Sequence, residues 1–347
     1  MTTAASPTSG MTVTAVPSDP LAKRFQTPIE KCEVEDKKRL AEYRYHWQKW
    51  MQWYSHGTSE PHSIESQIHQ MVFDDLTYRS IVSVRESVPA DVAVSSRSST
   101  LAYLLDRGYF FTQILAIQKL LDNRDDVISI RRLLKDVRRH RKLITREVYV
   151  AGDGLPYDYN KWSGTIDKTD PMVQIYGIDA PGLHDFATSK YLHETFDLLA
   201  GKQPSSRTKK DVIPDSIFQA LESWISGSDA EEITNIRHNF IAHAASSIRL
   251  GSLQFKALKF SQIDNVQRAL VRVERALMDH ILSIRIARNV VPLPPLGIFS
   301  GLDLPYAPSE QQVKMHQRWD ELQDDRNGWS KDVLKDLASG HSQNPTS

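Results

Sequence analysis

The chain has 347 residues, of which 40% are hydrophobic and 25% are charged. This composition is ordinary for a folded globular protein and excludes a disordered or fibrous chain, and the length suits either one large domain with appendages or two domains. Because 43 basic residues balance 43 acidic ones, any attraction to nucleic acid has to come from local patches rather than from net charge.

Cysteine usage and hydropathy indicate the compartment. Cys32 is the single cysteine, which excludes an internal disulfide framework and multi-thiolate metal sites and is typical of a reducing compartment. Residues 1–27 are rich in Ser, Thr, Ala and Pro and lack the apolar core of an export signal, so we expect a disordered leader there. No stretch approaches about eighteen uninterrupted apolar residues. We therefore expect a cytoplasmic protein that does not enter a membrane.

The first half of the chain predicts four helices. Residues 30–54 have helical composition and place aromatic side chains on one helix face. Such a stripe favours packing against the body of the protein over a stacking platform for bases. Its members are Tyr43, Trp47, Trp50 and Tyr54. The other helices are expected over residues 63–87, 99–121 and 129–148.

The second half begins with a long irregular segment. Residues 151–182 hold many Gly, Pro, Asp and Tyr residues without a sustained period and predict a loop inserted between helices. Helical patterns then resume until Pro292, where a proline-rich segment cannot continue a helix. The expected helices are residues 183–199, 214–225, 229–248, 262–288 and, beyond the prolines, 309–325.

These patterns predict an all-α chain in three parts. A helical domain over residues 28–291 follows the leader and carries the aromatic helix at its N-terminal end. Residues 292–347 form a C-terminal extension with a proline-rich linker, a short helix and a polar tail, which we expect to be partly mobile.

Residues 237–243 carry the clearest chemical pattern. On a helical wheel Arg237 falls inside a broad apolar face, where a charge requires an acid, a phosphate or a second subunit. His243 lies at the edge of the same face, about 9 Å of axial rise further on, and Asn239 is one turn before it. A fixed cation, a proton-exchanging group and an amide suit phosphodiester chemistry. The alternative is an arginine paired with an acid and an interfacial histidine, both without catalytic roles.

The helix expected over residues 129–148 has one basic face. Seven Lys and Arg residues fall within about 120° of the wheel, opposite an apolar face. Because neighbouring like charges on a helix repel, this face favours binding to RNA or another polyanion. Neutralisation by acidic residues elsewhere in the fold is the alternative. The seven residues are Arg131, Arg132, Lys135, Arg138, Arg139, Lys142 and Arg146.

Two stretches resemble the HEPN superfamily, and within it the abortive-infection type of phage-defence protein. Residues 233–243 look like that family's motif of an Arg followed by a polar residue, with Ala before the His. Residues 114–122, followed by 129–134, are similar to the helix, the Asp-containing break and the next helix of the abortive-infection branch. The resemblance covers about residues 63–288, so the aromatic helix and the C-terminal extension are additions to a HEPN-like bundle.

The resemblance implies a homodimer that cleaves RNA without a metal ion or cofactor, as a toxin or antiviral effector with an antitoxin as partner. His243 would exchange a proton with the ribose 2′-hydroxyl or the leaving oxygen, and Arg237 would stabilise the phosphorane. Asn239 would orient the phosphate, and His238 is the polar residue after the Arg. Ala245 stands where members with a nucleotidyltransferase antitoxin carry Tyr, so regulation through that Tyr is not expected. The alternative function is a non-catalytic HEPN-like dimerisation protein, or a regulator that binds nucleotides or RNA.

Overall fold

The structure is a computed structural model of the chain. All regular elements in its described segments are helices, and the only β pairing there is an isolated bridge between Thr145 and Val212. The prediction of an all-α fold is therefore confirmed for this part of the chain. The segments that the structure describes are residues 24–55, 62–87, 99–161, 183–236, 258–284, 289–295, 297–299 and 309–339.

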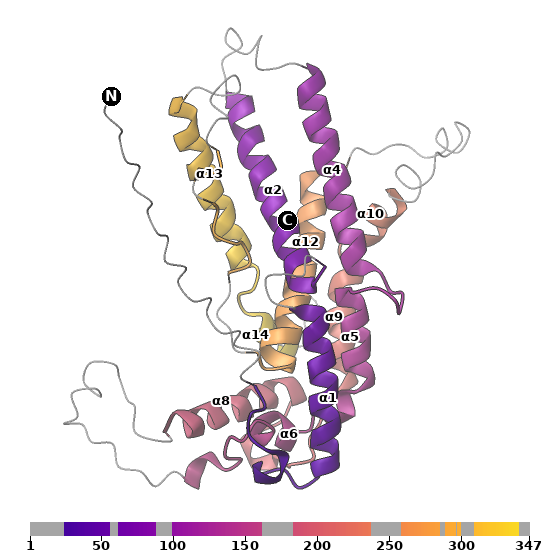
Figure 1. Ribbon diagram of the computed structural model, residues 1–347, viewed down its shortest axis with the longest axis vertical. Coiled ribbons are helices and arrows are strands. Elements are labelled where there is room, and N and C mark those ends of the chain that lie inside the picture. The colour runs from indigo at the N-terminus through magenta and orange to yellow at the C-terminus, as the bar shows by residue number, and fades with distance from the viewer. Residues whose placement is uncertain are drawn as a thin grey trace, which may run out of the picture.

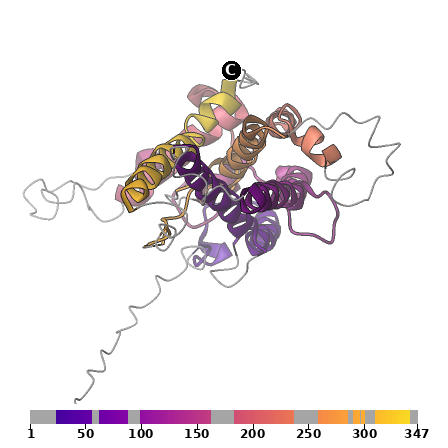
Figure 2. The same cartoon turned by 90° about the horizontal axis from the view of Figure 1, so that it is seen from above.

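Helices along the long axis of the molecule form a bundle, and other helices cross one end of it. Helices α2, α4, α12 and α13 lie side by side along the long axis of the molecule, and α6 and α8 lie across one end (Figures 1 and 2). The α-helices are α1 (Lys37–Tyr54), α2 (Ile64–Ser87), α4 (Ser99–Leu121), α5 (Ile130–Arg139), α6 (Arg146–Ala151), α8 (Leu183–Ala200), α9 (Asp215–Ser226), α10 (Ala230–Ile236), α12 (Phe260–Arg275), α13 (Ser309–Gly328) and α14 (Val333–Ser339). The short elements are the 3-10 helices η2 (Ile29–Lys31), η3 (Arg141–Leu143), η4 (Tyr159–Lys161) and η5 (Pro204–Ser206), and the π-helix η7 (Ala276–Ile281), which continues α12.

The aromatic face of α1 is part of the core. Asp36 starts this helix because its side chain accepts a hydrogen bond from the backbone N–H of Arg39. The aromatic side chains are between 0% and 3% exposed and join a hydrophobic cluster that continues to Leu337 in α14. The prediction that the stripe packs on the body of the protein is confirmed. Its residues are Tyr43, Trp47, Trp50 and Tyr54.

The prediction of one continuous helix over residues 129–148 is wrong in its second half. α5 ends at Arg139, the chain passes through η3, and α6 begins after Thr145, whose side chain caps it. The backbone N–H of Arg146 donates to the carbonyl oxygen of Asp211 at 2.9 Å. A continuous helix would need that N–H for the carbonyl four residues earlier. Here α6 starts at Arg146, so this N–H lacks an acceptor within the helix and bonds to the loop before α9 instead.

The helix expected over residues 262–288 also ends earlier than predicted. Arg24, near the N-terminus of the chain, caps the C-terminal end of this helix. The π-helix η7 ends at Ile281, and Ser283 has a φ angle of 53°, in the left-handed region. The Nη1 atom of Arg24 donates to the carbonyl oxygens of Leu282 at 2.7 Å and Ser283 at 2.8 Å. These bonds satisfy carbonyls that a helix end leaves without partners. The final residues of the expected helix lie outside the described ones.

The C-terminal extension packs on the bundle. α13 lies along α2 with Trp319 buried, and Arg326, 3% exposed, pairs with Asp75 of α2 and Asp264 of α12, each at 3.0 Å. A polar tail that is partly mobile is expected after the last helix, and its mobility stays a prediction. It contains α14, which buries Leu337 and packs against α8 and α9.

Two organisational predictions are not tested by the described residues: the boundary at residue 291 and the HEPN-like arrangement of the helices. Of the leader expected over residues 1–27, only residues 24–27 are described, and Arg24 among them is bonded to the end of η7. Of the loop expected over residues 151–182, the described part contains only the end of α6 and η4 as regular structure. Among the described helices, none combines the length and the apolar character that a bilayer crossing requires.

Candidate functional site

The predicted catalytic motif begins directly after α10. This helix is packed in the bundle: Ile233 is fully buried, and the Oγ1 atom of Thr234 accepts a hydrogen bond from Nε2 of Gln118 in α4 at 2.5 Å. The chain therefore enters the motif from a helix held against α4 and α9. The geometry of the motif itself stays a prediction, because its residues lie outside the described ones. They are Arg237, His238, Asn239 and His243.

α5 separates an apolar face from a basic one, as the helical wheel predicts. Its four apolar residues, from Ile130 to Val137, are 0% exposed, and this burial turns the Lys and Arg side chains outward. A serine begins the helix: the Oγ of Ser129 accepts from the N–H of Arg132 at 3.1 Å. We define the basic surface as Arg131, Arg132, Lys135, Arg138 and Arg139 of α5 with Lys142 of η3.

Carboxylates partly neutralise the basic surface. Arg138 donates two hydrogen bonds to Asp215, at 2.9 and 2.5 Å, and this pairing lowers the pKa of the Asp215 carboxyl to about 2. Such partly exposed pairs contribute little to stability, but they reduce the local positive potential. Part of the alternative interpretation, a charged face balanced by acids elsewhere in the fold, is therefore observed. Longer ion pairs join Arg131 to Glu222 at 3.8 Å and Lys135 to Asp125 at 3.7 Å.

The positive charge that remains lies at the end of α5 and beside α1. Arg139 and Lys142 are exposed, and no carboxylate of the described residues pairs with either. Arg132 lies over the indole ring of Trp53 in α1 at 4.2 Å, and Lys49 lies 4.7 Å from the same ring. No local sequence signal places α1 beside the basic surface, because the contact joins residues far apart in the chain.

Arg146 does not belong to the basic surface, and its assignment to RNA binding is wrong. Its side chain is 0% exposed and lies 2.8 Å from Asp197 and 3.0 Å from Asp211. It also stacks over the ring of Phe196 at 4.8 Å. Because an unpaired buried guanidinium would be very costly, the two carboxylates explain how the interior accepts it. Arg146 thus joins α6 to α8 and to the loop before α9.

His193 lies beside this ion pair and is also structural. It is 3% exposed, and its Nε2 donates to the carbonyl oxygen of Tyr157 at 2.8 Å. Burial lowers the pKa of His193, so the imidazole is neutral near pH 7. Asp197, four residues later, is held by Arg146 and Arg207. A buried neutral imidazole cannot reach a macromolecular substrate.

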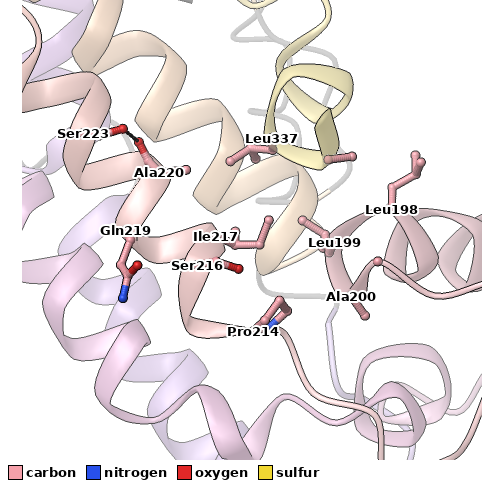
Figure 3. A pocket seen from close by; sticks show the side chains of 12 residues that line it. Leu198, Leu199, Ala200, Pro214, Ser216, Ile217, Gln219, Ala220, Ser223 and Leu337 are labelled. Carbon is pink, nitrogen blue, oxygen red and sulfur yellow. Dashed lines mark hydrogen bonds between the residues drawn. The ribbon is translucent and has the colours of Figure 1, made fainter. Parts of the chain in front are cut away.

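An open pocket of about 570 Å³ lies between α8, α9 and α14 (Figure 3). Leu198, Ile217 and Leu337 supply apolar walls, and Ser216 and Gln219 are among its few polar side chains. None of its lining residues is charged or titratable near neutral pH. The pocket can hold an apolar group, but it offers no acid, base or nucleophile for catalysis.

Comparison of the chain with protein-family models, with curated proteins and with solved structures finds no match in any of the three.

Proposed function

We propose that this protein is a metal-independent endoribonuclease of the HEPN type that acts on RNA as a homodimer in the cytoplasm. By the same resemblance it would be a toxin or an antiviral defence effector, held in check by an antitoxin. The pattern Arg237 to His243 carries the proposal, because it combines a permanent cation and a proton-exchanging group at the spacing of the HEPN motif.

The proposed chemistry needs only side chains. His243 would take the proton from a ribose 2′-hydroxyl or give one to the leaving oxygen, and Arg237 would stabilise the charge that grows on the phosphorane. Asn239 would orient the phosphate and His238 would hold the polar position after the arginine. Pairing of two chains would cover the apolar face on which the wheel places Arg237 and would bring two motifs together.

The basic surface supports RNA as the substrate. Arg139 and Lys142 are exposed without a carboxylate partner among the described residues, so each can release a counterion when it meets a phosphate. The basic surface and the helix leading into the motif also share neighbours. α5 and α10 both pack against α4 and α9, which supports one RNA strand reaching from the basic surface toward the motif.

A cleavage assay in excess chelator tests the proposal. We expect the wild-type protein to cut RNA and to leave a 2′,3′-cyclic phosphate, since the 2′-hydroxyl attacks. His243→Ala should lower the rate by about 10²–10⁴-fold, as expected for loss of a general acid or base. His184→Ala, at an exposed histidine on α8, is the matched control and should cut normally. If His243→Ala cuts as fast as the wild type, this mechanism is wrong.

The acidic partners of the basic surface favour a second function, a non-catalytic regulator that binds RNA or a nucleotide, or that only dimerises. In that case Arg237 would be structural. Arg237→Ala would then lower the melting temperature or dissociate the dimer, whereas loss of a catalytic Arg would remove activity with little change in either. Analytical ultracentrifugation and thermal unfolding of the same preparation separate the two functions.

A further inference from the structure

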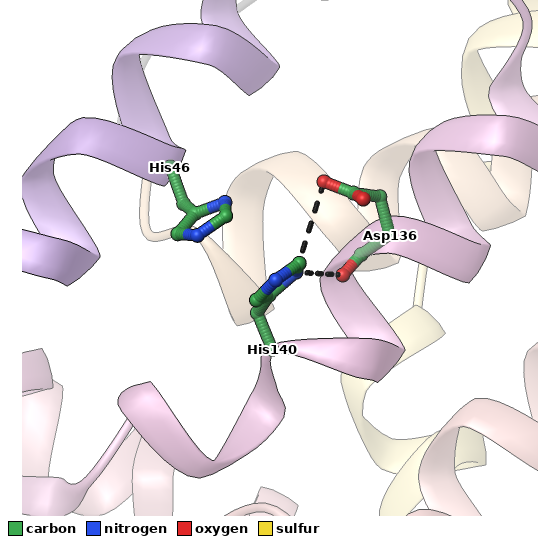
Figure 4. Close-up of side chains that lie close together, drawn as sticks. All are labelled: His46, Asp136 and His140. Atoms are coloured by element: carbon green, nitrogen blue, oxygen red, sulfur yellow. Dashed lines mark hydrogen bonds and ion pairs between the residues drawn. The ribbon is translucent and has the colours of Figure 1, made fainter. Parts of the chain in front are cut away.

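Two imidazoles and one carboxylate meet where α1 packs against α5. His46 comes from α1, Asp136 lies in the last turn of α5, and His140 follows α5 directly (Figure 4). One ligand atom from each, a ring nitrogen or a carboxylate oxygen, lies within 4.8 Å of the other two. Asp136 and His140 are four residues apart, which places both on one side of α5, facing α1.

The hydrogen bonds in this cluster leave ligand positions open. The Oδ2 atom of Asp136 accepts from the indole N–H of Trp50 at 2.8 Å and from the ammonium of Lys49 at 3.1 Å, while no described residue donates to Oδ1. The Nδ1 atom of His46 is buried without a hydrogen-bond partner among the described residues. A buried polar atom without a partner is unfavourable. A ligand that bonds to this nitrogen would remove that cost, and the described side chains do not supply one.

The protonation states also suit a cation. Burial and the neighbouring His140 lower the pKa of His46, so its imidazole is neutral with a free lone pair. Burial opposes charge on Asp136, but donors such as Trp50 and Lys49 lower its pKa, so the carboxylate is ionised. The Nδ1 of His140 lies 2.9 Å from the carbonyl oxygen of Asp136 and 3.8 Å from its Oδ2. Because a carbonyl only accepts, that nitrogen donates, and the other ring nitrogen is left for a ligand.

We propose that His46, Asp136 and His140 bind one divalent transition-metal ion of the zinc class. Two imidazole nitrogens and one carboxylate oxygen form a ligand set suited to Zn²⁺ or Co²⁺, and three protein ligands leave a fourth position for water. The carbonyl that accepts from His140 is the kind of partner that orients metal-bound histidines. The ion links α1 to α5 beside the basic surface.

The imidazoles have to move for the ion to bind. Their rings are stacked, with centroids 3.8 Å apart and planes inclined by 30°. Because the lone pair of an imidazole lies in the plane of its ring, both rings must rotate out of the stack to direct nitrogens at one ion. Lys49 must also yield part of its contact with Asp136, since two cations compete for one carboxylate. Metal uptake and the Lys49 contact are therefore coupled.

Metal uptake by the full chain tests this proposal. The protein is treated with chelator, freed of it, and titrated with Zn²⁺ by calorimetry and with Co²⁺ by visible absorption. We expect one ion per chain and a Co²⁺ spectrum without thiolate charge-transfer bands. His46→Phe keeps a flat ring but no ligand nitrogen, and it should weaken binding at least about tenfold, as should His140→Gln. The control His184→Ala should bind normally. No uptake, or uptake that both variants retain, overturns the proposal.

Two further measurements cover variants that fail to fold. In ¹H–¹⁵N spectra of the wild-type imidazoles, Zn²⁺ should shift two of the 12 histidines, and a shift of none or of many contradicts the site. Lys49→Met removes the competing cation and should tighten Zn²⁺ binding several-fold. Unchanged or weaker binding would show that Zn²⁺ and Lys49 do not compete for the Asp136 carboxylate, which would then serve Lys49 alone. The site does not depend on the proposed RNA cleavage, because that reaction is assayed in chelator.

Discussion

Replacement of Arg146 by Met removes a guanidinium that holds two carboxylates in the interior. Met keeps an unbranched apolar stem but has no donor, so Asp197 and Asp211 lose contacts at 2.8 and 3.0 Å. Each carboxylate keeps another partner. Asp197 still pairs with Arg207 at 2.6 Å, and Asp211 still accepts from the backbone N–H and the hydroxyl of Thr208 at 3.0 and 2.8 Å.

The size of the effect follows from these remaining contacts. Removal of one partner from a buried ion pair costs about 3–5 kcal/mol. Because both carboxylates keep donors, we expect the lower end for Arg146→Met, a loss of about 3 kcal/mol in the free energy of unfolding. The matched control is Arg139→Met, since Arg139 is exposed and has no carboxylate partner among the described residues. It should change the free energy of unfolding by less than about 0.5 kcal/mol.

Urea unfolding followed by circular dichroism measures both variants, and RNA binding is measured where each is folded. Folded Arg146→Met should bind RNA as the wild type does, because a buried side chain cannot contact phosphate. The reasoning is refuted if Arg146→Met unfolds within about 0.5 kcal/mol of the wild type and binds RNA more weakly. That result would return Arg146 to the basic surface.

Three other outcomes are expected. Replacing both Arg139 and Lys142 with Gln should make the plot of log RNA affinity against log salt less steep, by roughly 1.4 for a single-stranded probe in anisotropy titrations. An unchanged slope would mean that neither side chain contacts a phosphate. The free energy of unfolding should fall as the pH drops from about 7.5 to about 5.5, because the unfolded histidines take up protons near pH 6.5 while burial lowers the pKa of His193 and His280. His193→Gln should weaken this pH dependence, measured by urea unfolding at each pH. A wild-type free energy of unfolding that does not change with pH would contradict the prediction. Trp319→Ala should cost about 3–5 kcal/mol, since the side chain is 1% exposed, whereas a cost below about 1 kcal/mol would contradict the packing of α13 on α2.

Helices with a sustained apolar pattern could be predicted from the sequence. The residues that alternate between core and surface in α1, α2 and α8 do so at the period of the helix itself, so neighbours in the chain carry the information. The apolar face of α5 is buried for the same reason. The short helix α14 escaped prediction because its seven residues contain too few turns to display a period.

The two helix breaks were not predicted, and residues far away in the chain bond to the backbone near both of them. The N–H of Arg146 turns to Asp211, and Arg24 caps the carbonyl of Leu282 from 258 residues away. Neither contact leaves a mark on the local pattern. The same contacts decide where side chains point: the wheel places Arg146 with the exposed arginines only if the helix continues past Arg139.

The two candidate sites differ in the same respect: the sequence predicts one of them, and only the tertiary structure brings the other together. Residue types and spacing alone determine the predicted chemistry of Arg237 and His243, since both belong to one short segment. The cluster of His46 with Asp136 and His140 was decided by tertiary structure, because its members come from two helices that meet only when the apolar faces of α1 and α5 share one core. A local pattern records which face of a helix is buried; which two helices then face each other depends on the packing of the whole chain.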